Sequence, residues 1–361
     1  MVYTNTSRAG RRGPHAIAGA LVMVLLAACT AAAPTAAPTA GPTSAPTTAP
    51  TSEPTPEETL SLAYLSFAVA NSYDAPMLAA AKAAAANLNA EITVFDANNS
   101  PDAQFTQLQD ALASGQYDGI IVQPIFGPAL IESITAGIAD GAQIAVLDQI
   151  LGEDLTTSEA QVDGLAANVV FVQSEIGRKQ GELTVQACAE FALDPCNVGF
   201  LYNIKASSLD TAIRTAFDEV IADHPEISVV AEGEAFYTVA LGLTATQDML
   251  TAHPEINVIV GADQGITGAV TALEGAERTD VALVGYGGAG VAYNRIAADP
   301  QQQYATVAQL PASEGQYVVE DLIRAIRSGT PSPSRDPVSE LPDEGIVTGD
   351  NVANFVAEWP G

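Results

Sequence analysis

Basic residues are scarce in this chain of 361 residues, where 13 Lys and Arg stand against 43 Asp and Glu. The formal net charge of −30 argues against nucleic acid and against adsorption onto anionic lipid. Histidine is equally rare, and His15, His224 and His253 have no metal-ligand spacing. A G-x-S-x-G motif is absent, and no nucleophile is paired with a histidine. These absences predict a protein that is not an enzyme and that uses neither metal nor cofactor.

Long hydrophobic runs are also missing. The longest, Ala16–Ala28, has thirteen residues, too few to span a bilayer core of about 30 Å. It follows a basic start at Arg8, Arg11 and Arg12 and ends in small residues, which is typical of a secretory signal. Residues 1–28 are therefore predicted to be a cleaved leader. Arg11-Arg12 alone does not indicate twin-arginine export.

The run closes with Leu26-Ala27-Ala28-Cys29, which resembles the cleavage site of bacterial lipoproteins. The resemblance implies that Cys29 is lipidated and becomes the new N-terminus. We thus expect an extracytoplasmic protein anchored by lipid to the outer face of the cell membrane. The alternative is an ordinary signal peptide with an incidental cysteine.

Residues 29–58 are predicted to be a disordered tether after the lipidated cysteine. From residue 30 on they are almost entirely Ala, Pro, Thr and Ser, with acidic residues only at Glu53, Glu57 and Glu58. Such a stretch buries too little apolar surface to fold, and fully extended it reaches about 90 Å. Without the leader, which contains three basic and no acidic residues, the chain has a formal charge of −33.

Two cysteines remain, Cys188 and Cys196, with Pro195 marking a turn between them. In an oxidising compartment this spacing favours a disulfide between a helix end and a strand start. A metal site is not expected, because no histidine or third cysteine lies nearby in the sequence.

Short apolar runs, often β-branched, recur along the remaining 300 or so residues and alternate with alanine-rich stretches of helical spacing. Buried strands that alternate with helices predict parallel sheets covered on both faces, and ten strands predict two doubly wound lobes. His224 and His253 lie in near-identical HPEI segments, which we interpret as helix-to-strand turns. The predicted strands are 60–67, 91–95, 118–123, 143–148, 168–172, 197–202, 227–232, 256–261, 281–286 and 304–309. The predicted helices include 75–88, 103–112, 128–139, 176–191, 209–221, 239–250 and 314–326.

Polar and aromatic residues follow many of these strands, where ligands bind in doubly wound sheets. Carboxylates and amides suit paired hydroxyl groups, and aromatic rings suit the C–H face of a sugar. Phe236 is expected in the core and Tyr237 in the site. The predicted ligand-binding residues are Asn71, Tyr73, Asp74, Gln123, Asp148, Gln149, Asp210, Tyr237, Asp263 and Gln309.

Four stretches carry a resemblance to a known family: ANSYDAPMLAAAKAAA, YDGIIVQP, QIAVLDQ and ATVAQLP. Together with LTAHPEINVIVGADQGITGAV, they make the chain from Leu60 to Phe355 similar to the periplasmic binding proteins of sugar importers, in particular the ribose-binding group. The resemblance implies first-lobe contacts from Asn71, Tyr73, Asp74, Gln123 and Asp148. It implies a stacking role for Tyr237 and a hinge-side amide at Gln309.

Three positions depart from that family pattern. Ala262 stands where an asparagine is usual, Gly287 replaces an aspartate, and Thr211 lies nearest to a missing arginine. These changes remove hydrogen-bonding groups from the second lobe and argue against ribose itself.

The resemblance also implies an architecture and a mechanism. Two doubly wound lobes would be joined by a three-strand hinge, with an N-terminal lobe of residues 59–173 plus 310–337 and a C-terminal lobe of 174–309 plus 338–361. A monomeric protein would close around a sugar or sugar-like polyol and deliver it to the permease of an ABC importer.

Several alternatives stay open. The closed form could instead dock onto a membrane receptor kinase, and Asp74, Asp148 and Asp263 could in principle serve a secreted glycoside hydrolase. Asp148 could cap the next segment and Tyr73 could pack under the first helix. Asp210 could be a helix N-terminal charge and Asp263 a helix cap. The leader argues against a repressor of the LacI type, and GYGGAG lacks the spacing of a dinucleotide loop.

Overall fold

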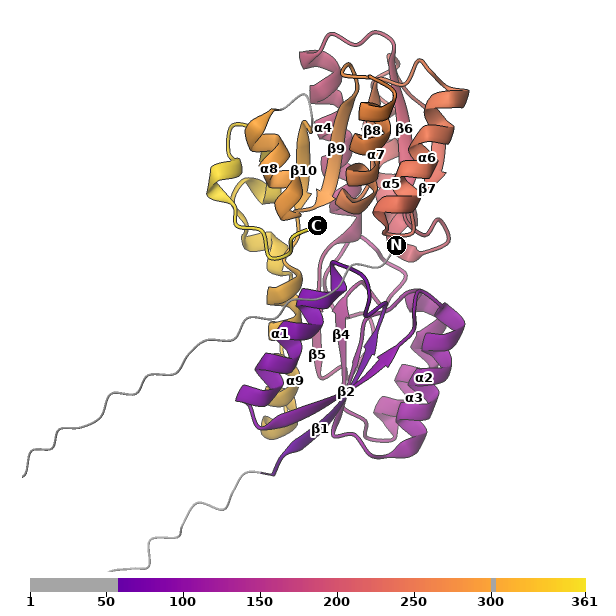
Figure 1. Cartoon of the computed structure of the whole chain (residues 1–361). Coiled ribbons are helices and arrows are strands. Elements are labelled where there is room, and N and C mark those ends of the chain that lie inside the picture. The colour runs from indigo at the N-terminus through magenta and orange to yellow at the C-terminus, as the bar shows by residue number, and fades with distance from the viewer. Residues whose placement is uncertain (1–57, 300–302) are drawn as a thin grey trace, which may run out of the picture. The chain divides into compact units, whose positions relative to one another are not determined.

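The computed structural model describes residues 58–299 and 303–361. The predicted leader, Cys29 and nearly all of the tether therefore lie outside the described residues. Residues 56–361 form one compact unit built on two sheets (Figure 1). Within the described ranges, no helix combines the length and the apolar character needed to cross a bilayer.

The first lobe is a five-stranded parallel sheet in the order β2-β1-β3-β4-β5. Helices α1 and α9 pack on one face of this sheet, and α2 and α3 pack on the other. The strands are β1 (Leu60–Ser66), β2 (Ala90–Asp96), β3 (Gly119–Val122), β4 (Ile144–Asp148) and β5 (Ala167–Val170). The helices are α1 (Asp74–Asn87), α2 (Pro101–Ser114), the 3-10 turn η1 (Gly127–Leu130), α3 (Ile131–Ala139) and α9 (Pro311–Ser328).

Strand β1 shows why this sheet is covered on both faces. Leu62 and Tyr64 pack against α1 and α9, while Ala63 and Leu65 pack against α2 and α3. Successive side chains of a strand point to opposite faces, so a continuous apolar run requires a cover on each side. The ends of the strands are then where polar side chains can face a ligand.

The second lobe is a six-stranded sheet in the order β11-β10-β9-β8-β6-β7. All its strands are parallel except β11, which pairs antiparallel with β10. The strands are β6 (Cys196–Tyr202), β7 (Ile227–Glu234), β8 (Val258–Val260), β9 (Ala282–Gly287), β10 (Ala305–Ala308) and β11 (Ile346–Thr348). The helices are α4 (Gln173–Glu190), α5 (Ser208–Ile221), α6 (Val239–Ala252), α7 (Asp263–Gly275) and α8 (Gly290–Ala298). Three short 3-10 turns follow α9, namely η2 (Pro337–Glu340), η3 (Pro342–Gly345) and η4 (Val352–Asn354).

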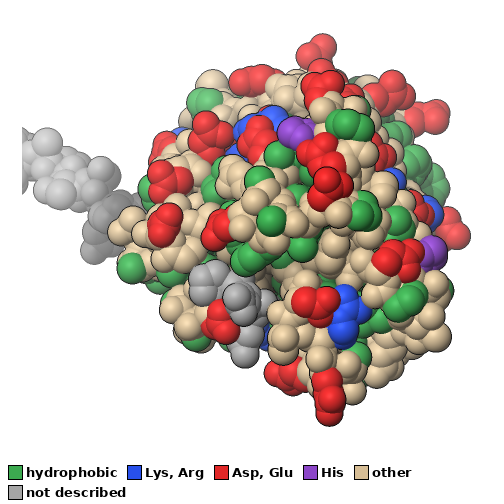
Figure 2. All heavy atoms as spheres, turned by 90° about the horizontal axis from the view of Figure 1, so that it is seen from above, with side chains coloured by type: hydrophobic (Ala, Val, Ile, Leu, Met, Phe, Trp, Pro, Cys, Tyr) green, Lys and Arg blue, Asp and Glu red, His purple; other side chains and the backbone are tan. Residues whose placement is uncertain are grey.

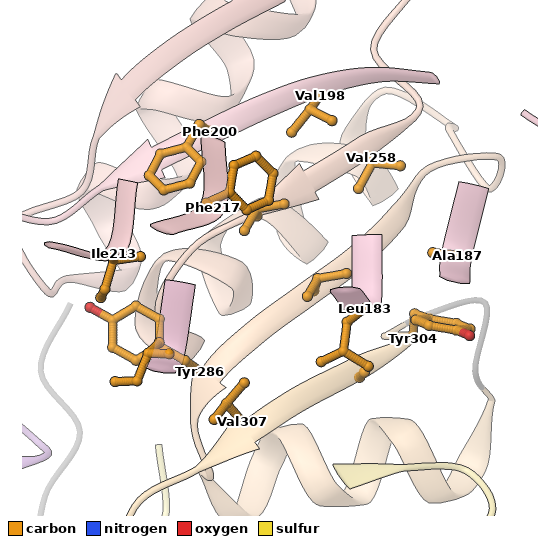
Figure 3. Packing of buried hydrophobic residues seen from close by; sticks show 14 of the residues in the cluster. Leu183, Ala187, Val198, Phe200, Ile213, Phe217, Val258, Tyr286, Tyr304 and Val307 are labelled. Carbon is orange, nitrogen blue, oxygen red and sulfur yellow. The ribbon is translucent and has the colours of Figure 1, made fainter. Parts of the chain in front are cut away.

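The core of the second lobe also lies on both faces of its sheet. Leu183 of α4 and Phe217 of α5 pack on Phe200, Val258 and other strand residues on one face (Figure 3). A second cluster joins α6 and α7 to the opposite face through Met249, Ile266 and their neighbours.

Two doubly wound lobes are thus confirmed, and each of the ten predicted runs overlaps a strand. Strand β11 was not predicted, because a three-residue edge strand has no periodicity of its own. The chain leaves the first sheet after β5, returns to it with α9, and ends in the second lobe with β11. The exact residues at which each lobe begins stay a prediction.

Simple local signals set the helix ends. Ser100 accepts a hydrogen bond from the Ala103 backbone N–H at the start of α2, and Gly115 ends that helix with φ 59°. Helix α9 starts with Pro311 and is followed by Gly329 at φ 66°. Proline in the first turn and left-handed glycine at the C-cap are the usual punctuation of a helix.

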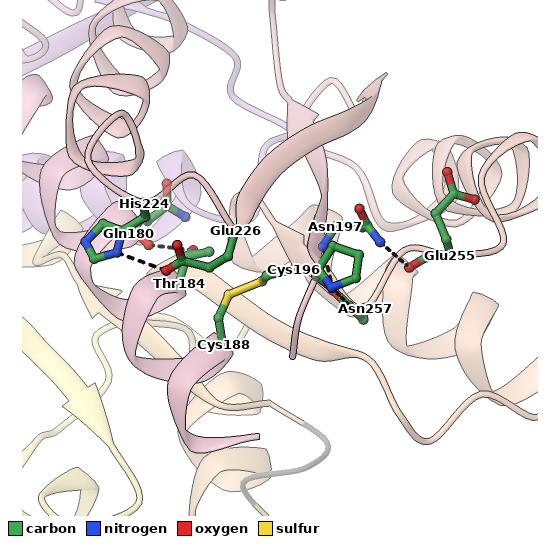
Figure 4. Close-up of a disulfide and its surroundings, with 10 residues drawn as sticks. Gln180, Thr184, Cys188, Cys196, Asn197, His224, Glu226, Glu255 and Asn257 are labelled. Carbon is green, nitrogen blue, oxygen red and sulfur yellow. Dashed lines mark hydrogen bonds and ion pairs between the residues drawn. A yellow bond between two sulfur atoms is a disulfide. The ribbon is translucent and has the colours of Figure 1, made fainter. Parts of the chain in front are cut away.

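A disulfide joins Cys188 of α4 to Cys196 of β6, the pairing that the sequence analysis favoured. Figure 4 shows it beside one of the two HPEI turns. In these turns His224 and His253 lie 3.2 and 3.1 Å from the carboxylates of Glu226 and Glu255. The duplicated segments are therefore matching helix-to-strand turns. Among the described residues no group of three or more His, Cys, Asp or Glu could hold a metal ion.

The close packing of α9 on α1 gives a test of the fold. A Cβ atom at Gly315 would lie 2.0 Å from the backbone oxygen of Met77, which cannot move without shifting α1. We expect Gly315→Ala to lower the free energy of unfolding by about 1 to 3 kcal/mol, measured by urea denaturation. The matched control is Gly275→Ala at the end of α7, where an added Cβ meets no atom within 4 Å. Equal stability of the two variants would contradict the described packing.

Candidate ligand-binding site

The carboxyl ends of both sheets meet at one small cavity of about 30 Å³. The cavity is lined by Phe67, Asn71, Tyr73, Asp74, Gln123, Asp148, Gln149, Phe171, Leu209, Tyr237, Ala262, Gln264, Tyr286, Gly287 and Gln309.

One glutamine organises the first-lobe side of the cavity. The side-chain N–H₂ of Gln123 donates to Asp74 Oδ1 at 2.7 Å and to Asp148 Oδ2 at 3.1 Å. Its Oε1 accepts from the backbone N–H of Phe67 at 3.0 Å, which fixes the orientation of the amide. Asp74 and Asp148 are each 3% exposed. A single amide therefore holds two buried carboxylates side by side at the cavity wall.

The backbone turns sharply at Asp148, the last residue of β4. Asp148 has φ 68°, and the N–H of Gln149 donates to the carbonyl of Leu147 at 2.7 Å. This three-residue γ-turn is uncommon for a residue with a Cβ, and strained backbone of this kind concentrates at functional sites. The turn brings both Asp148 and Gln149 to the cavity.

Tyr73 links the first-lobe carboxylates to two residues that the sequence analysis did not name. Its hydroxyl lies 3.4 Å from Asp148 Oδ1 and 3.5 Å from Oε2 of Glu314, which is fully buried at the start of α9. Its ring meets the Trp359 ring edge-on, with centroids 5.5 Å apart. Trp359 donates from Nε1 to the carbonyl of Gly287 at 2.7 Å.

That contact explains one departure from the family pattern. A Cβ at Gly287 would lie 2.9 Å from the Trp359 ring, and Gly287 itself has φ 123°. Only glycine adopts this backbone easily, and the indole fills the space beside it. Trp359, near the C-terminus, thus occupies the space that a side chain at position 287 would need, and no local sequence pattern could reveal this contact.

The second lobe contributes aromatic rings. Phe236 and Tyr237 follow β7 with φ of 45° and 54°, and the Tyr237 ring meets Phe67 of the first lobe edge-on at 5.8 Å. Phe236 is 41% exposed, so the expectation that it lies in the core is wrong. Tyr286 lies deeper and accepts a hydrogen bond from Asn203 Nδ2 at 2.8 Å. Aromatic rings from both lobes therefore line the cavity.

The carboxyl groups at the cavity are buried with no positively charged partner among the described residues, and this raises their pKa values. Burial raises the pKa of Asp148 to about 6, against the opposing effect of the Gln123 hydrogen bond. Burial, followed by the charge of Asp148, raises the pKa of Asp74 well above its ordinary value. The same two causes raise the pKa of Glu314.

Two predicted site residues do not reach the cavity. Asp210 accepts from the backbone N–H groups of Asn203 and Ile204, at 3.2 and 2.6 Å, and folds the loop before α5. Its own N–H donates to the N-cap residue Ser207, so the interpretation as a helix N-terminal carboxylate describes it better.

Asp263 is fully buried and faces away from the cavity. It accepts from the Ala289 backbone N–H at 2.9 Å, from Gln303 at 3.1 Å and from Thr306 at 3.0 Å. These bonds brace the loop between β9 and α8. The residues on either side, Ala262 and Gln264, line the cavity instead.

The other eight predicted residues do line the cavity, and several keep unpaired polar atoms there. Gln264 Nε2 lies 3.4 Å from Asn71 Oδ1, a direct contact between the lobes. The buried atoms without a hydrogen-bond partner among the described residues include Asp74 Oδ2, Gln149 Oε1, Tyr237 Oη and Gln309 Nε2. Unpaired buried polar atoms are costly, so this arrangement is suited to a ligand rich in hydroxyl groups.

The raised pKa of Asp148 predicts a pH-dependent stability. The protonated acid favours folding, so its contribution is complete below pH about 4 and is lost as the pH rises through about 6. Asp148→Asn removes this loss. The free energy of unfolding of the variant and of the original protein is measured by urea denaturation without ligand at pH 4.5 and pH 7.5. We expect the difference between the two proteins to shift in favour of the variant by about 1 to 3 kcal/mol from the lower to the higher pH.

The exposed Asp102→Asn variant should show no such pH-dependent difference. A gain for Asp148→Asn at pH 4.5 rather than at pH 7.5 would contradict the burial of an uncompensated carboxyl.

The model of a family described as "Periplasmic binding protein domain" matches residues 62–330. Among curated proteins, the chain is similar to a D-apiose import binding protein from Actinobacillus succinogenes, at 32% identity over 128 residues. That match covers 35% of this chain and 41% of the relative, so it spans less than half of the relative's length.

Solved structures share the fold along most of the chain. An ABC transporter solute-binding protein from Bacillus halodurans C-125 with bound myo-inositol has a TM-score of 0.70 at 21% identity, covering 84% of this chain and 99% of that one. One from Mycobacterium smegmatis with bound glycerol has a TM-score of 0.69 at 23% identity, with the same two shares of coverage. Because the family model covers most of the described residues, the chain belongs to the periplasmic binding protein domain family.

Proposed function

We propose that this protein captures a sugar or sugar-like polyol between its two lobes and delivers it to the permease of an ABC importer. The observation that carries the proposal is the set of unpaired polar atoms from both lobes at one cavity. Asp74 Oδ2 and Gln149 Oε1 come from the first lobe and would accept hydrogen bonds from hydroxyl groups. Tyr237 Oη from the second lobe would donate or accept a hydrogen bond, and Gln309 Nε2 after β10 would donate one.

The aromatic residues support the same ligand class. Phe67, Tyr237 and Tyr286 offer apolar faces beside these polar groups. A sugar presents both surfaces, hydroxyl groups on its rim and C–H groups on its ring. The similar proteins named above fit this proposal. One is named for the import of a pentose, D-apiose, and the other two have bound myo-inositol and glycerol.

The mechanism we propose is closure of two lobes without chemistry. Gln264 and Asn71, and Phe67 and Tyr237, already meet across the lobes around the cavity. A ligand held by both sides has a higher affinity for this arrangement than for an open one, and it therefore shifts the population toward closure. The permease would recognise the closed form.

The location follows from the sequence. We propose that the leader exports the chain, that Cys29 is lipidated, and that residues 30–58 hold the folded unit away from the outer face of the membrane. Figure 2 shows acidic side chains across the face seen from above, with few basic ones. Such a surface would not adsorb onto anionic lipid, so the lipid would serve as the anchor. We propose the predicted lobe boundaries and a monomeric state for the same protein.

A thermal-shift screen against pentoses, hexoses, inositols and glycerol tests the proposal. A ligand at about 100 times its Kd stabilises the folded state by about 2.7 kcal/mol, so the melting temperature should rise clearly for at least one of them. Asp74→Ala and Gln309→Ala should each weaken that ligand at least tenfold by calorimetry, because each removes a buried hydrogen bond from a different side of the cavity. Asp102→Ala is the control for the loss of one carboxylate from the surface. Unchanged melting curves with every polyol would contradict the proposal.

A further inference from the structure

The charged side chains that line the cavity are all acidic. Its lining contains two carboxylates, Asp74 and Asp148, and no Lys, Arg or His. A third carboxyl, Glu314, lies directly behind them and is 0% exposed. Neutral side chains, those of Gln123 and Tyr73, donate hydrogen bonds to these groups, and Asp148 and Glu314 are also hydrogen-bonded to each other. No ion pair of the described residues includes any of the three.

The groups packed around this cluster do not supply a positive charge either. Asp96 at the end of β2 acts on Asp74, while Asp336 and Glu358 act on Glu314, and all three are acidic. The other titratable neighbours are the hydroxyl groups of Tyr64, Tyr73, Tyr237 and Tyr286, which stay neutral because burial raises their pKa further. None of these neighbouring side chains therefore adds a positive charge at this end of the cavity.

Aromatic rings complete the surroundings. Phe67 and Tyr237 meet edge-on at the cavity, and Tyr73, Phe171 and Tyr286 also line it. The face of an aromatic ring attracts a cation, more strongly where water is excluded. Carboxylates among several aromatic rings form the usual environment for a substituted ammonium group.

We infer that the ligand is an aminated sugar or polyol, whose ammonium group lies against Asp74 and Asp148. This inference rests on the proposed function and narrows its ligand class. Asp74 Oδ2 is the specific acceptor, because it is buried, lines the cavity and has no partner among the described residues. An ammonium group has three donors and could reach both carboxylates, whereas a hydroxyl group has one donor and no charge.

Calorimetry with matched ligands tests this inference at pH 7.5. The probes are D-glucosamine, D-galactosamine, D-mannosamine and 1-amino-1-deoxy-D-sorbitol, each compared with its hydroxyl parent and its N-acetyl derivative. We expect at least one amine to bind ten times more tightly than both of its neutral counterparts.

Asp148→Asn should reduce the ratio of amine to parent affinity at least tenfold, and Asp102→Asn should leave that ratio unchanged. Asp74→Asn serves as the second variant if the first fails to fold. Neutral parents that bind as tightly as their amines, or more tightly, would overturn the inference and leave the proposed function standing. Binding of neither class would overturn both.

Discussion

Two buried carboxylates held against one glutamine are the interaction on which this site depends. Gln123 extends from the end of β3 between Asp74 and Asp148 and is oriented by the backbone of Phe67. In a low-dielectric interior, like charges repel strongly, so the arrangement persists through shared protons, neutral donors or a ligand. The parallel sheet brings the two carboxylates together, because the ends of β1, β3 and β4 lie at one edge. The γ-turn at Asp148 fixes the position of the second carboxylate.

The second lobe meets this acidic edge with rings and amides. Its own carboxylates at similar strand ends are used differently: Asp210 folds the loop before α5, and Asp263 braces the loop before α8. Trp359, from the last residues of the chain, fills the space beside Gly287 and supports Tyr73 of the first lobe. The second lobe has loops that are fixed by buried carboxylates, and the first lobe has neutral donors. Both lobes therefore present unpaired polar atoms to one small cavity.

Much of the fold could be predicted from the sequence, because its strands are continuous apolar runs and its helices have clear starts and stops. The positions that line the cavity could be predicted for the same reason, since Gln123 directly follows β3, Asp148 is the last residue of β4 and Asn71 lies in the loop after β1. The direction of a side chain could not be predicted. Asp263 and Gln264 are adjacent, yet the first faces three donors inside the lobe and the second faces the cavity. Glu314 and Trp359 were missed because tertiary packing alone, across more than two hundred residues of sequence, brings them to Tyr73.

A crystal structure with the tightest ligand from the matched panel tests the central claim most directly. The account predicts that the molecule lies in the cavity between the lobes, within hydrogen-bond distance of Asp74 Oδ2 and Gln309 Nε2 at the same time. A tight ligand that contacts only one lobe, or that leaves Asp74 Oδ2 without a partner, would contradict it.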